Sequence, residues 1–278
     1  MREELEAVFR NRELGTVRSV RVIDSYQNQV FDVFADAGHF VVKYYEDELI
    51  QKRKAQVEVS KKWQENGINC ILPVGDFYKG ERGYYLVYEY FENESRKNLN
   101  DDDIKKLAQI QAKMHELNVS STLLCDYREI ELNIQRDELQ DLIQKCNKGL
   151  ANAKKELVIS HNDFKPKNIL WHANEPYLVD FDAVSKVNPT AAAYESAFTF
   201  AYDKGTVDVD RFKKYLREYQ KHCAFNQSDY LKYVSMNGKL RWLAFIYEKD
   251  WRRDLNLMKE VDDLVFELEV FNKFISLW

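Results

Sequence analysis

A polar stretch between residues 159 and 184 contains the side chains of this chain that are best suited to chemistry. It begins with a loop of four polar residues, His161, Asp163, Lys165 and Asn168. Two short apolar runs, 169–171 and 177–179, follow on either side of a turn-rich segment, which predicts a β-hairpin with a wider loop. Two acidic residues, Asp180 and Asp182, end the second run. A hairpin would fold these carboxylates back toward the polar loop.

Phosphoryl transfer from a nucleotide needs such a set of groups. One carboxylate orients the attacking hydroxyl and accepts its proton, while oxygen ligands hold Mg²⁺ against the phosphates. The spacing His-x-Asp-x4-Asn, with a further Asp twelve residues after Asn168, matches the catalytic-loop and metal-loop signatures of kinases. The alternative is that these Asp and Asn residues only form turns beside a hairpin.

The stretch resembles the aminoglycoside phosphotransferase and choline kinase superfamily, which are small-molecule kinases with a protein-kinase-like fold. Its His-Asn-Asp opening is most similar to choline and ethanolamine kinases, whereas Lys165-Pro166 is similar to the protein-kinase loop. The resemblance implies that Asp163 is the catalytic base and that His161 supports the loop backbone. For Lys165, neutralising the transferring phosphoryl group and a plain surface position are both open.

The resemblance also implies the metal ligands. Asn168 and Asp180 supply the hard oxygen donors that suit Mg²⁺. Asp182 stands where protein kinases have a glycine, and we assign it to a second metal or its water shell.

The first third of the chain is rich in strand patterns. An amphipathic helix is predicted over 2–14, and β-rich runs follow at 17–23, 30–35 and 40–45. The resemblance implies that the loop 24–29 covers the nucleotide phosphates. This loop contains no glycine, so Ser25 is its candidate phosphate contact; a polar hairpin turn is the alternative.

Lys43 lies on a predicted strand face that it shares with apolar residues, so its charge needs a partner. The resemblance implies that it contacts the nucleotide phosphates and pairs with a glutamate of the helix predicted over 47–66. Glu58 is the candidate, although Gln56 and Glu48 lie on the same helix. The alternative is a lysine that protects an exposed sheet edge.

Two further strands are predicted at 71–74 and 84–90. The second resembles the kinase hinge strand, where the backbone of Glu89 and Phe91 would bind the adenine edge. The polar run after Phe91 predicts a boundary between a nucleotide-binding lobe, 1–91, and a catalytic and substrate lobe, 92–278.

Helical patterns dominate the rest of the chain. They predict helices at 104–117, 136–156, 208–224, 228–251 and 253–276. The expected fold class is therefore α+β: a two-lobed protein-kinase-like fold with a small antiparallel-sheet N-lobe and a larger helical C-lobe.

Composition narrows the protein class. The 278 residues include 45% hydrophobic and 31% charged residues, which is typical of a globular protein. A net charge of −5 gives no reason to expect nucleic-acid binding. The charged N-terminus and the lack of a long apolar run predict a cytoplasmic protein without a membrane segment. Four cysteines without CxxC spacing argue against a zinc site.

The sequence says least about the substrate that would accept the phosphate. Glu195 stands where the family usually has Asp, and a helical stripe with Trp242, Tyr247 and Trp251 could hold a cationic substrate against aromatic faces. The alternative is that these aromatic residues belong to the hydrophobic core and that the charged residues beside them form the solvent-exposed face of the helix.

These residues predict a phosphotransferase that uses ATP (or GTP) and Mg²⁺. Its substrate is a hydroxylated small molecule, either aminoglycoside-like or an amino alcohol. The alternative is a catalytically silent kinase-like nucleotide-binding module, which a glycine-free phosphate loop would allow. The presence of Lys43, Asp163, Asn168 and Asp180 favours the enzyme.

Overall fold

The fold was analysed in a computed structural model that describes residues 2–23, 29–94, 96, 98–117, 119, 121–248 and 255–277, with the backbone alone at 255 and 256. The chain divides into two compact units. The first comprises Met1–Ser95 and Leu170–Asp182, and the second comprises Arg96–Ile169 and Ala183–Trp278. Each unit is described by itself.

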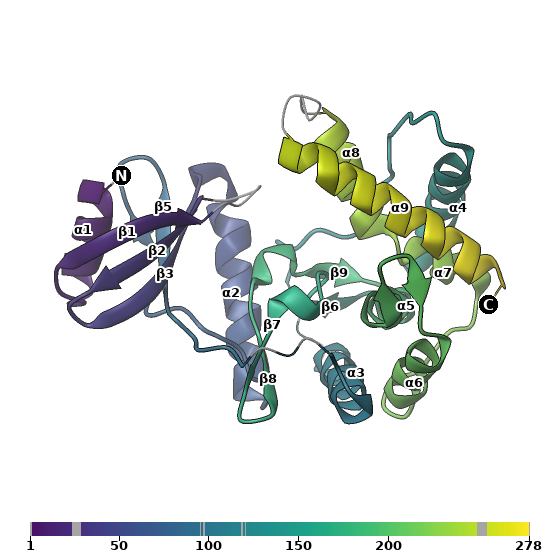
Figure 1. The fold of residues 1–278 in the computed structure, drawn as a ribbon, viewed down its shortest axis with the longest axis horizontal. Helices are drawn as coiled ribbons and strands as arrows, with labels where there is room; N and C mark the ends of the chain where they lie inside the picture. The colour runs from purple at the N-terminus through teal and green to yellow at the C-terminus, as the bar shows by residue number, and fades with distance from the viewer. Residues whose placement is uncertain are drawn as a thin grey trace. The chain divides into compact units, whose positions relative to one another are not determined.

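An antiparallel sheet forms the centre of the first unit (Figure 1). Its strand order is β1 (Val17–Ile23), β2 (Gln29–Ala35), β3 (Gly38–Tyr45), β5 (Tyr84–Glu89) and β4 (Tyr78–Lys79). The predicted strands at 17–23, 30–35, 40–45 and 84–90 are confirmed within two residues. The prediction of a strand at 71–74 is wrong. Pro73 has no N–H to donate to a ladder, and the sheet edge is formed by β4 instead.

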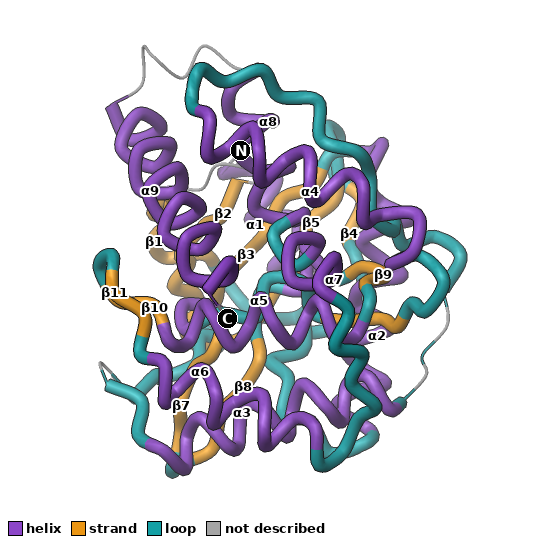
Figure 2. Tube along the Cα trace, turned by 90° about the vertical axis from the view of Figure 1, so that its right-hand side faces the viewer, coloured by secondary structure: helices purple, strands orange, loops and turns teal. Residues whose placement is uncertain are grey.

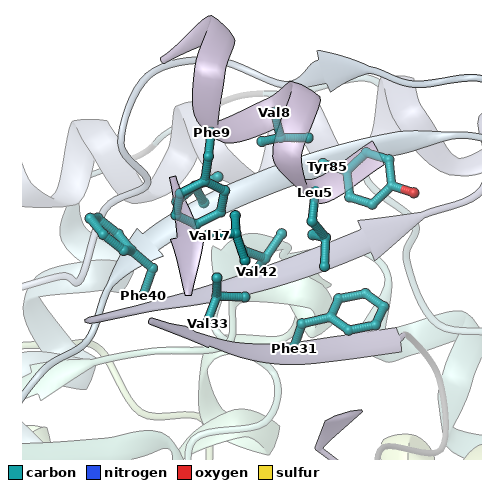
Figure 3. Close-up of a cluster of buried hydrophobic side chains, with 10 residues drawn as sticks. Leu5, Val8, Phe9, Val17, Phe31, Val33, Phe40, Val42 and Tyr85 are labelled. Carbon is teal, nitrogen blue, oxygen red and sulfur yellow. The ribbon is translucent and has the colours of Figure 1, made fainter. Parts of the chain in front are cut away.

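Helix α1 (Arg2–Asn11) covers one face of this sheet. Its side chains Leu5, Val8 and Phe9 are fully buried against residues that include Val33 and Val42, as Figure 3 shows. The helix ends earlier than the predicted residue 14, because the chain turns through positive φ angles at Glu13 (57°) and Gly15 (81°).

The substitution Phe9→Ala should destabilise the first unit by about 3–5 kcal/mol, because it empties a packed aromatic site. Phe9 is 0% exposed and meets the ring of Phe40 edge-on at a centroid distance of 5.3 Å. Urea unfolding measures the loss. Val22→Ala, at a side chain that is 64% exposed, is the control and should change stability little.

The opposite face of the sheet meets helix α2 (Ile50–Glu65), which follows the short helix η1 (Asp47–Leu49). Val57 of α2 packs with Tyr45 and Leu86 of the sheet. Further along α2, the buried Trp63 lies 6.3 Å from the ring of Phe181. The helix therefore contacts both the strand of Lys43 and the segment that carries the two acidic residues.

The predicted hairpin is confirmed as β7 (Ile169–His172) and β8 (Glu175–Leu178). Its loop is tighter than predicted, because Ala173 and Asn174 both adopt left-handed φ angles of 50° and 65°. Two such residues form the turn that matches the twist of antiparallel strands. The short helix η3 (Phe181–Ala183) follows the hairpin.

The second unit is mainly helical (Figures 1 and 2). Its helices are α3 (Asp101–Glu116), α4 (Asp137–Ala153), α5 (Pro189–Ala201), α6 (Val209–Gln220), α7 (Asp229–Val234), α8 (Asn237–Glu248) and α9 (Leu255–Leu277). Helix α6 packs against α3 and α5, while α4 packs against α7 and α9. Its short strands are β6 (Val158–Ser160), which pairs with β9 (Ser185–Val187), and β10 (Tyr202–Asp203), which pairs with β11 (Thr206–Val207).

The predicted helix 228–251 is in fact two helices, α7 and α8, with a break at Ser235 and Met236. The Ser235 hydroxyl donates to the Lys232 carbonyl, and the buried Asn237 donates to the Arg128 carbonyl at 2.8 Å. These polar contacts compete with a continuous helix. No described helix is long and apolar enough to cross a membrane.

Candidate active site

The loop after β6 belongs to the second unit and holds the Asp163 carboxylate from two sides. The Asn168 amide donates to Asp163 Oδ2 at 2.7 Å and to its backbone carbonyl at 2.8 Å. The Lys165 ammonium lies 2.5 Å from Asp163 Oδ1. Burial lowers the pKa of Lys165, but the charge and hydrogen bond of Asp163, with smaller contributions from Lys167 and Glu195, together outweigh burial and raise that pKa. Asp163 therefore has a fixed orientation beside a persistent cation, while its side chain stays 29% exposed.

Two histidines lie beneath this loop. His161 is fully buried, with its ring 6.3 Å from that of Phe164. His115 of α3 bonds Tyr219 at 2.7 Å and Ser160 at 3.0 Å, and burial lowers its pKa to about 3. A neutral His115 thus ties α3 and α6 to the end of β6, directly before the loop that carries Asp163.

A second cluster, in the first unit, surrounds Lys43. Its ammonium lies 2.6 Å from Asp180 Oδ1 and 3.3 Å from Asp182 Oδ2. Burial by itself lowers the pKa of Lys43, but the two carboxylates outweigh this and raise that pKa above its ordinary value. Lys43 is therefore a charged group on β3 whose side chain is only 15% exposed.

The expected pairing of Lys43 with Glu58 is not found. Glu58 is 61% exposed and pairs with Lys61 of its own helix at 2.9 Å. The reason is helical geometry. The side of α2 that faces the sheet carries Arg53, Gln56 and Val57, so Glu58, the next residue, points to another side of the helix.

Asp180 and Asp182 differ in their surroundings. The Asp182 carboxylate accepts from the Tyr45 hydroxyl at 3.0 Å and is 14% exposed. Asp180 is 42% exposed and adopts a left-handed φ of 64°. Asp is among the residues that tolerate this conformation, which turns the chain sharply after β8. Asp180 is thus the carboxylate with room to meet a cation.

The residues predicted as metal ligands, Asn168 and Asp180, offer oxygen donors of the kind that Mg²⁺ prefers. Among the described residues, no group of three or more His, Cys, Asp or Glu side chains is arranged as a metal site. Mg²⁺ is commonly held by one or two carboxylates together with phosphate oxygens and water. Asn168 directly precedes β7 and Asp180 follows β8, so the two oxygen donors flank one hairpin.

The structure describes only some of the other residues that were predicted to contact the nucleotide. Glu89 ends β5, and the Phe91 ring beyond it packs on Tyr177 at a centroid distance of 4.8 Å. Ser25 lies outside the described residues. The adenine and phosphate-loop assignments stay predictions.

Glu195 of α5 lies close to Asp163 and Lys165 in the second unit. Burial raises its pKa from 4.5 to about 7, although the nearby ammonium of Lys239 opposes the shift. Asp163 raises the pKa further and Lys165 lowers it. Lys239 itself donates to Thr199 at 3.1 Å and pairs with Glu267. Glu195 is therefore a half-buried carboxyl with both acidic and basic side chains near it.

This environment predicts a pH-dependent effect of Glu195→Gln. Since the folded pKa exceeds the ordinary 4.5, the contribution of Glu195 to stability is fully present below pH 4.5 and is lost as the pH rises through about 7. The stability of the wild type relative to the variant should fall by up to about 3 kcal/mol across this window. Urea unfolding at several pH values measures it. Glu138→Gln, at a 51% exposed side chain, should leave the profile unchanged.

The proposed aromatic stripe is only partly visible. Trp242 donates its indole N–H to Glu260 at 2.7 Å and stacks with Phe245 at a centroid distance of 5.2 Å. Tyr247 lies on α8 and is half-buried, while Trp251 lies outside the described residues. A cation-binding cage from Tyr247 and Trp251 stays a prediction.

Two residues near these clusters were not singled out by sequence reasoning. Arg53 is 6% exposed and binds the backbone carbonyl of Asp182 at 2.6 Å. Lys239 lies close enough to Glu195 to lower that residue's pKa. A lysine or arginine within an amphipathic helix carries no local signal that separates a buried partner from a solvated one.

Comparison with known proteins identifies the family and the fold of this chain. A family model described as "Phosphotransferase enzyme family" matches residues 19–191, more than half of the chain. The chain belongs to this phosphotransferase family. The predicted family and the predicted enzyme class are thereby confirmed. A search of curated proteins finds no match.

Solved structures of this family type match the chain over nearly its whole length. A spectinomycin phosphotransferase in complex with ADP and spectinomycin has a TM-score of 0.72 at 12% identity and covers 99% of this chain and 98% of its own. A microcompartment-associated aminopropanol kinase has a TM-score of 0.71 at 10% identity, covering 98% of both chains. A choline kinase from Streptococcus pneumoniae has a TM-score of 0.67 at 15% identity, covering 96% of this chain and 98% of its own. At such low sequence identity these structural matches show the fold alone. They confirm the predicted α+β kinase-like fold.

Proposed function

We propose that this phosphotransferase moves the γ-phosphate of ATP, with Mg²⁺, to a hydroxyl of a small molecule such as an amino alcohol or an aminoglycoside-like compound. The observation that carries the proposal is the Asp163 carboxylate, which Asn168 and Lys165 hold in one orientation. A carboxylate with a fixed orientation is what positions an acceptor hydroxyl and takes its proton. We also propose a cytoplasmic location for the protein.

Each remaining residue has a role in this proposal. Lys43 neutralises nucleotide phosphates, and its buried, charged state suits that task. Asp180 and the oxygen of the Asn168 carboxamide are the residues that would hold Mg²⁺, and the ion would supply positive charge to offset that of the phosphates. Lys165, beside Asp163, is placed to meet charge on the transferring phosphoryl group.

The acceptor end of the proposal depends on the surroundings of Asp163. Glu195 is a carboxyl near both Asp163 and Lys165. When ionised it would attract an ammonium group of the acceptor, which favours amino alcohols and aminoglycosides over neutral sugars. Spectinomycin, aminopropanol and choline, which appear in the names of the structural neighbours, are hydroxylated amines or quaternary ammonium compounds.

A screen of ATP consumption tests the proposal. The purified chain is incubated with Mg²⁺, ATP or GTP, and a panel of aminoglycosides, choline, ethanolamine, thiamine and neutral sugars. Turnover with a cationic acceptor, abolished by EDTA and by Asp163→Asn, is expected. No turnover with any acceptor, together with no Mg²⁺-dependent nucleotide binding, would instead support a silent kinase-like module.

A further inference from the structure

The environment of Asp182 departs from the arrangement that the resemblance implied. Its carboxylate lies 3.3 Å from the Lys43 ammonium, 3.0 Å from the Tyr45 hydroxyl and, through Oδ1, 3.5 Å from the Arg53 guanidinium. The carboxylate therefore contacts three protein groups from the sheet and from α2. This set leaves it less suited to a metal than the more exposed Asp180.

The backbone of Asp182 is held by α2 as well. Its carbonyl accepts from Arg53 at 2.6 Å and from the Gln56 amide at 2.8 Å. Arg53 also donates to Gln56 Oε1 at 2.9 Å, so the two helix residues form one hydrogen-bonded unit. Arg53 and Gln56 are 6% and 1% exposed. Groups that are buried to this extent are costly unless they are paired, so the pairing with Asp182 is a specific contact.

We propose that Asp182, held by Arg53 and Gln56 of α2, supplies the carboxylate partner of Lys43 and thereby positions Asp180. This inference rests on the proposed function. The charges are exchanged relative to the expected pair: α2 contributes a cation, and the anion comes from the segment after β8. Arg53 and Gln56 are positioning residues, since they act through Asp182 and Lys43.

The charges around Lys43 explain why it does not pair with Glu58. Lys43 needs a negative partner because it is buried, and two carboxylates from the segment after β8 meet that need. A third carboxylate from α2 would add repulsion beside Asp182, whereas a guanidinium balances the two acidic residues. Arg53 also lies over the Tyr45 ring at 5.3 Å, which adds a cation–π contact on the same side.

The test compares Arg53→Met, Gln56→Met and Glu58→Gln in the full-length protein. The affinity for a non-hydrolysable ATP analogue is measured by calorimetry with Mg²⁺ and with EDTA, beside kcat and KM for whichever acceptor the screen identifies. In Arg53→Met the Mg²⁺-dependent gain in nucleotide affinity should fall about 10- to 100-fold, as for groups that orient metal ligands. Nucleotide affinity in EDTA and KM for the acceptor should stay near wild type. In Gln56→Met the Mg²⁺-dependent gain in nucleotide affinity should fall about fivefold.

Two comparisons decide the outcome. Arg53→Lys keeps the charge but loses the planar fork, so it should recover part of the loss. Glu58→Gln should behave as wild type. A large loss in Glu58→Gln with none in Arg53→Met would overturn the proposal. Equal losses with Mg²⁺ and with EDTA would overturn it too, because they indicate a purely structural role.

A nucleotide-free experiment separates this proposal from the proposed function. In urea unfolding, Arg53→Met and Gln56→Met should be non-additive, because the two side chains bond each other and the same Asp182 carbonyl. Additive losses would contradict the contact itself. Absence of Mg²⁺-dependent nucleotide binding by the wild type would defeat the proposed function, and the positioning role with it, while non-additivity would still establish the contact.

Discussion

Asp163→Asn is expected to lower kcat by about 10²- to 10⁴-fold, the range that general-base catalysis contributes. The amide has nearly the same shape as the carboxylate, and its oxygen can still accept from the Asn168 amide, which now lies 2.7 Å from Asp163 Oδ2. What disappears is the capacity to take a proton and the charge that pairs with Lys165.

Nucleotide binding should survive in this variant. Lys43, Asp180 and Asp182 belong to the other unit of the chain and make their contacts with one another there. The measurement is single-turnover phosphorylation beside calorimetric binding of an ATP analogue. Asp102→Asn, at an 81% exposed side chain of the same unit, is the matched control and should retain activity. Phosphorylation by Asp163→Asn at the wild-type rate would remove Asp163 from the catalytic role.

The local features of this chain were predictable where short-range signals dominate. Alternating apolar residues and turn formers located the strands β1, β2 and β3, and the spacing from His161 to Asp180 located the polar loop and its hairpin. The helix predicted at 104–117 is found as α3, whose N-cap Asn100 forms a full capping box with Asp103. These features depend on contacts between residues close in sequence.

Long-range pairings were not predictable in the same way. Glu58 and Arg53 lie on one helix, and sequence spacing alone does not fix which of them faces the sheet. The family resemblance implied a partner for Lys43 on the following helix. The carboxylates that contact Lys43 are instead 137 and 139 residues away in the sequence. The choice depends on the rotation of α2 against the sheet, which packing of Val57 on Tyr45 and Leu86 decides.

The break between α7 and α8 has a similar origin. The pattern of residues 228–251 is mostly helical and contains no proline, although the dipeptide Asn237-Gly238 is typical of turns. The chain changes direction because the buried Asn237 is bonded to the Arg128 carbonyl from a distant segment. A tertiary hydrogen bond of this kind leaves no periodic signal in the sequence.

Asp180→Asn should abolish the Mg²⁺-dependent part of nucleotide binding and lower kcat by about a hundred- to a thousandfold, as removal of one electrostatic group does. Asn tolerates the left-handed φ of 64° as well as Asp does, so the turn after β8 is preserved. The variant removes one of the two carboxylates beside Lys43, at 2.6 Å, and leaves the other in place.

Titration of Mg²⁺ into the complex with an ATP analogue measures this effect directly. Asp76→Asn, at a side chain that is 95% exposed, is the control in the same unit and should titrate as the wild type does. An unchanged Mg²⁺ affinity in Asp180→Asn, with a large loss in Asp182→Asn, would reverse the two assignments. Asp182 would then be the metal ligand and Asp180 the partner that holds Lys43, because Asp180 already makes the shorter contact with that ammonium.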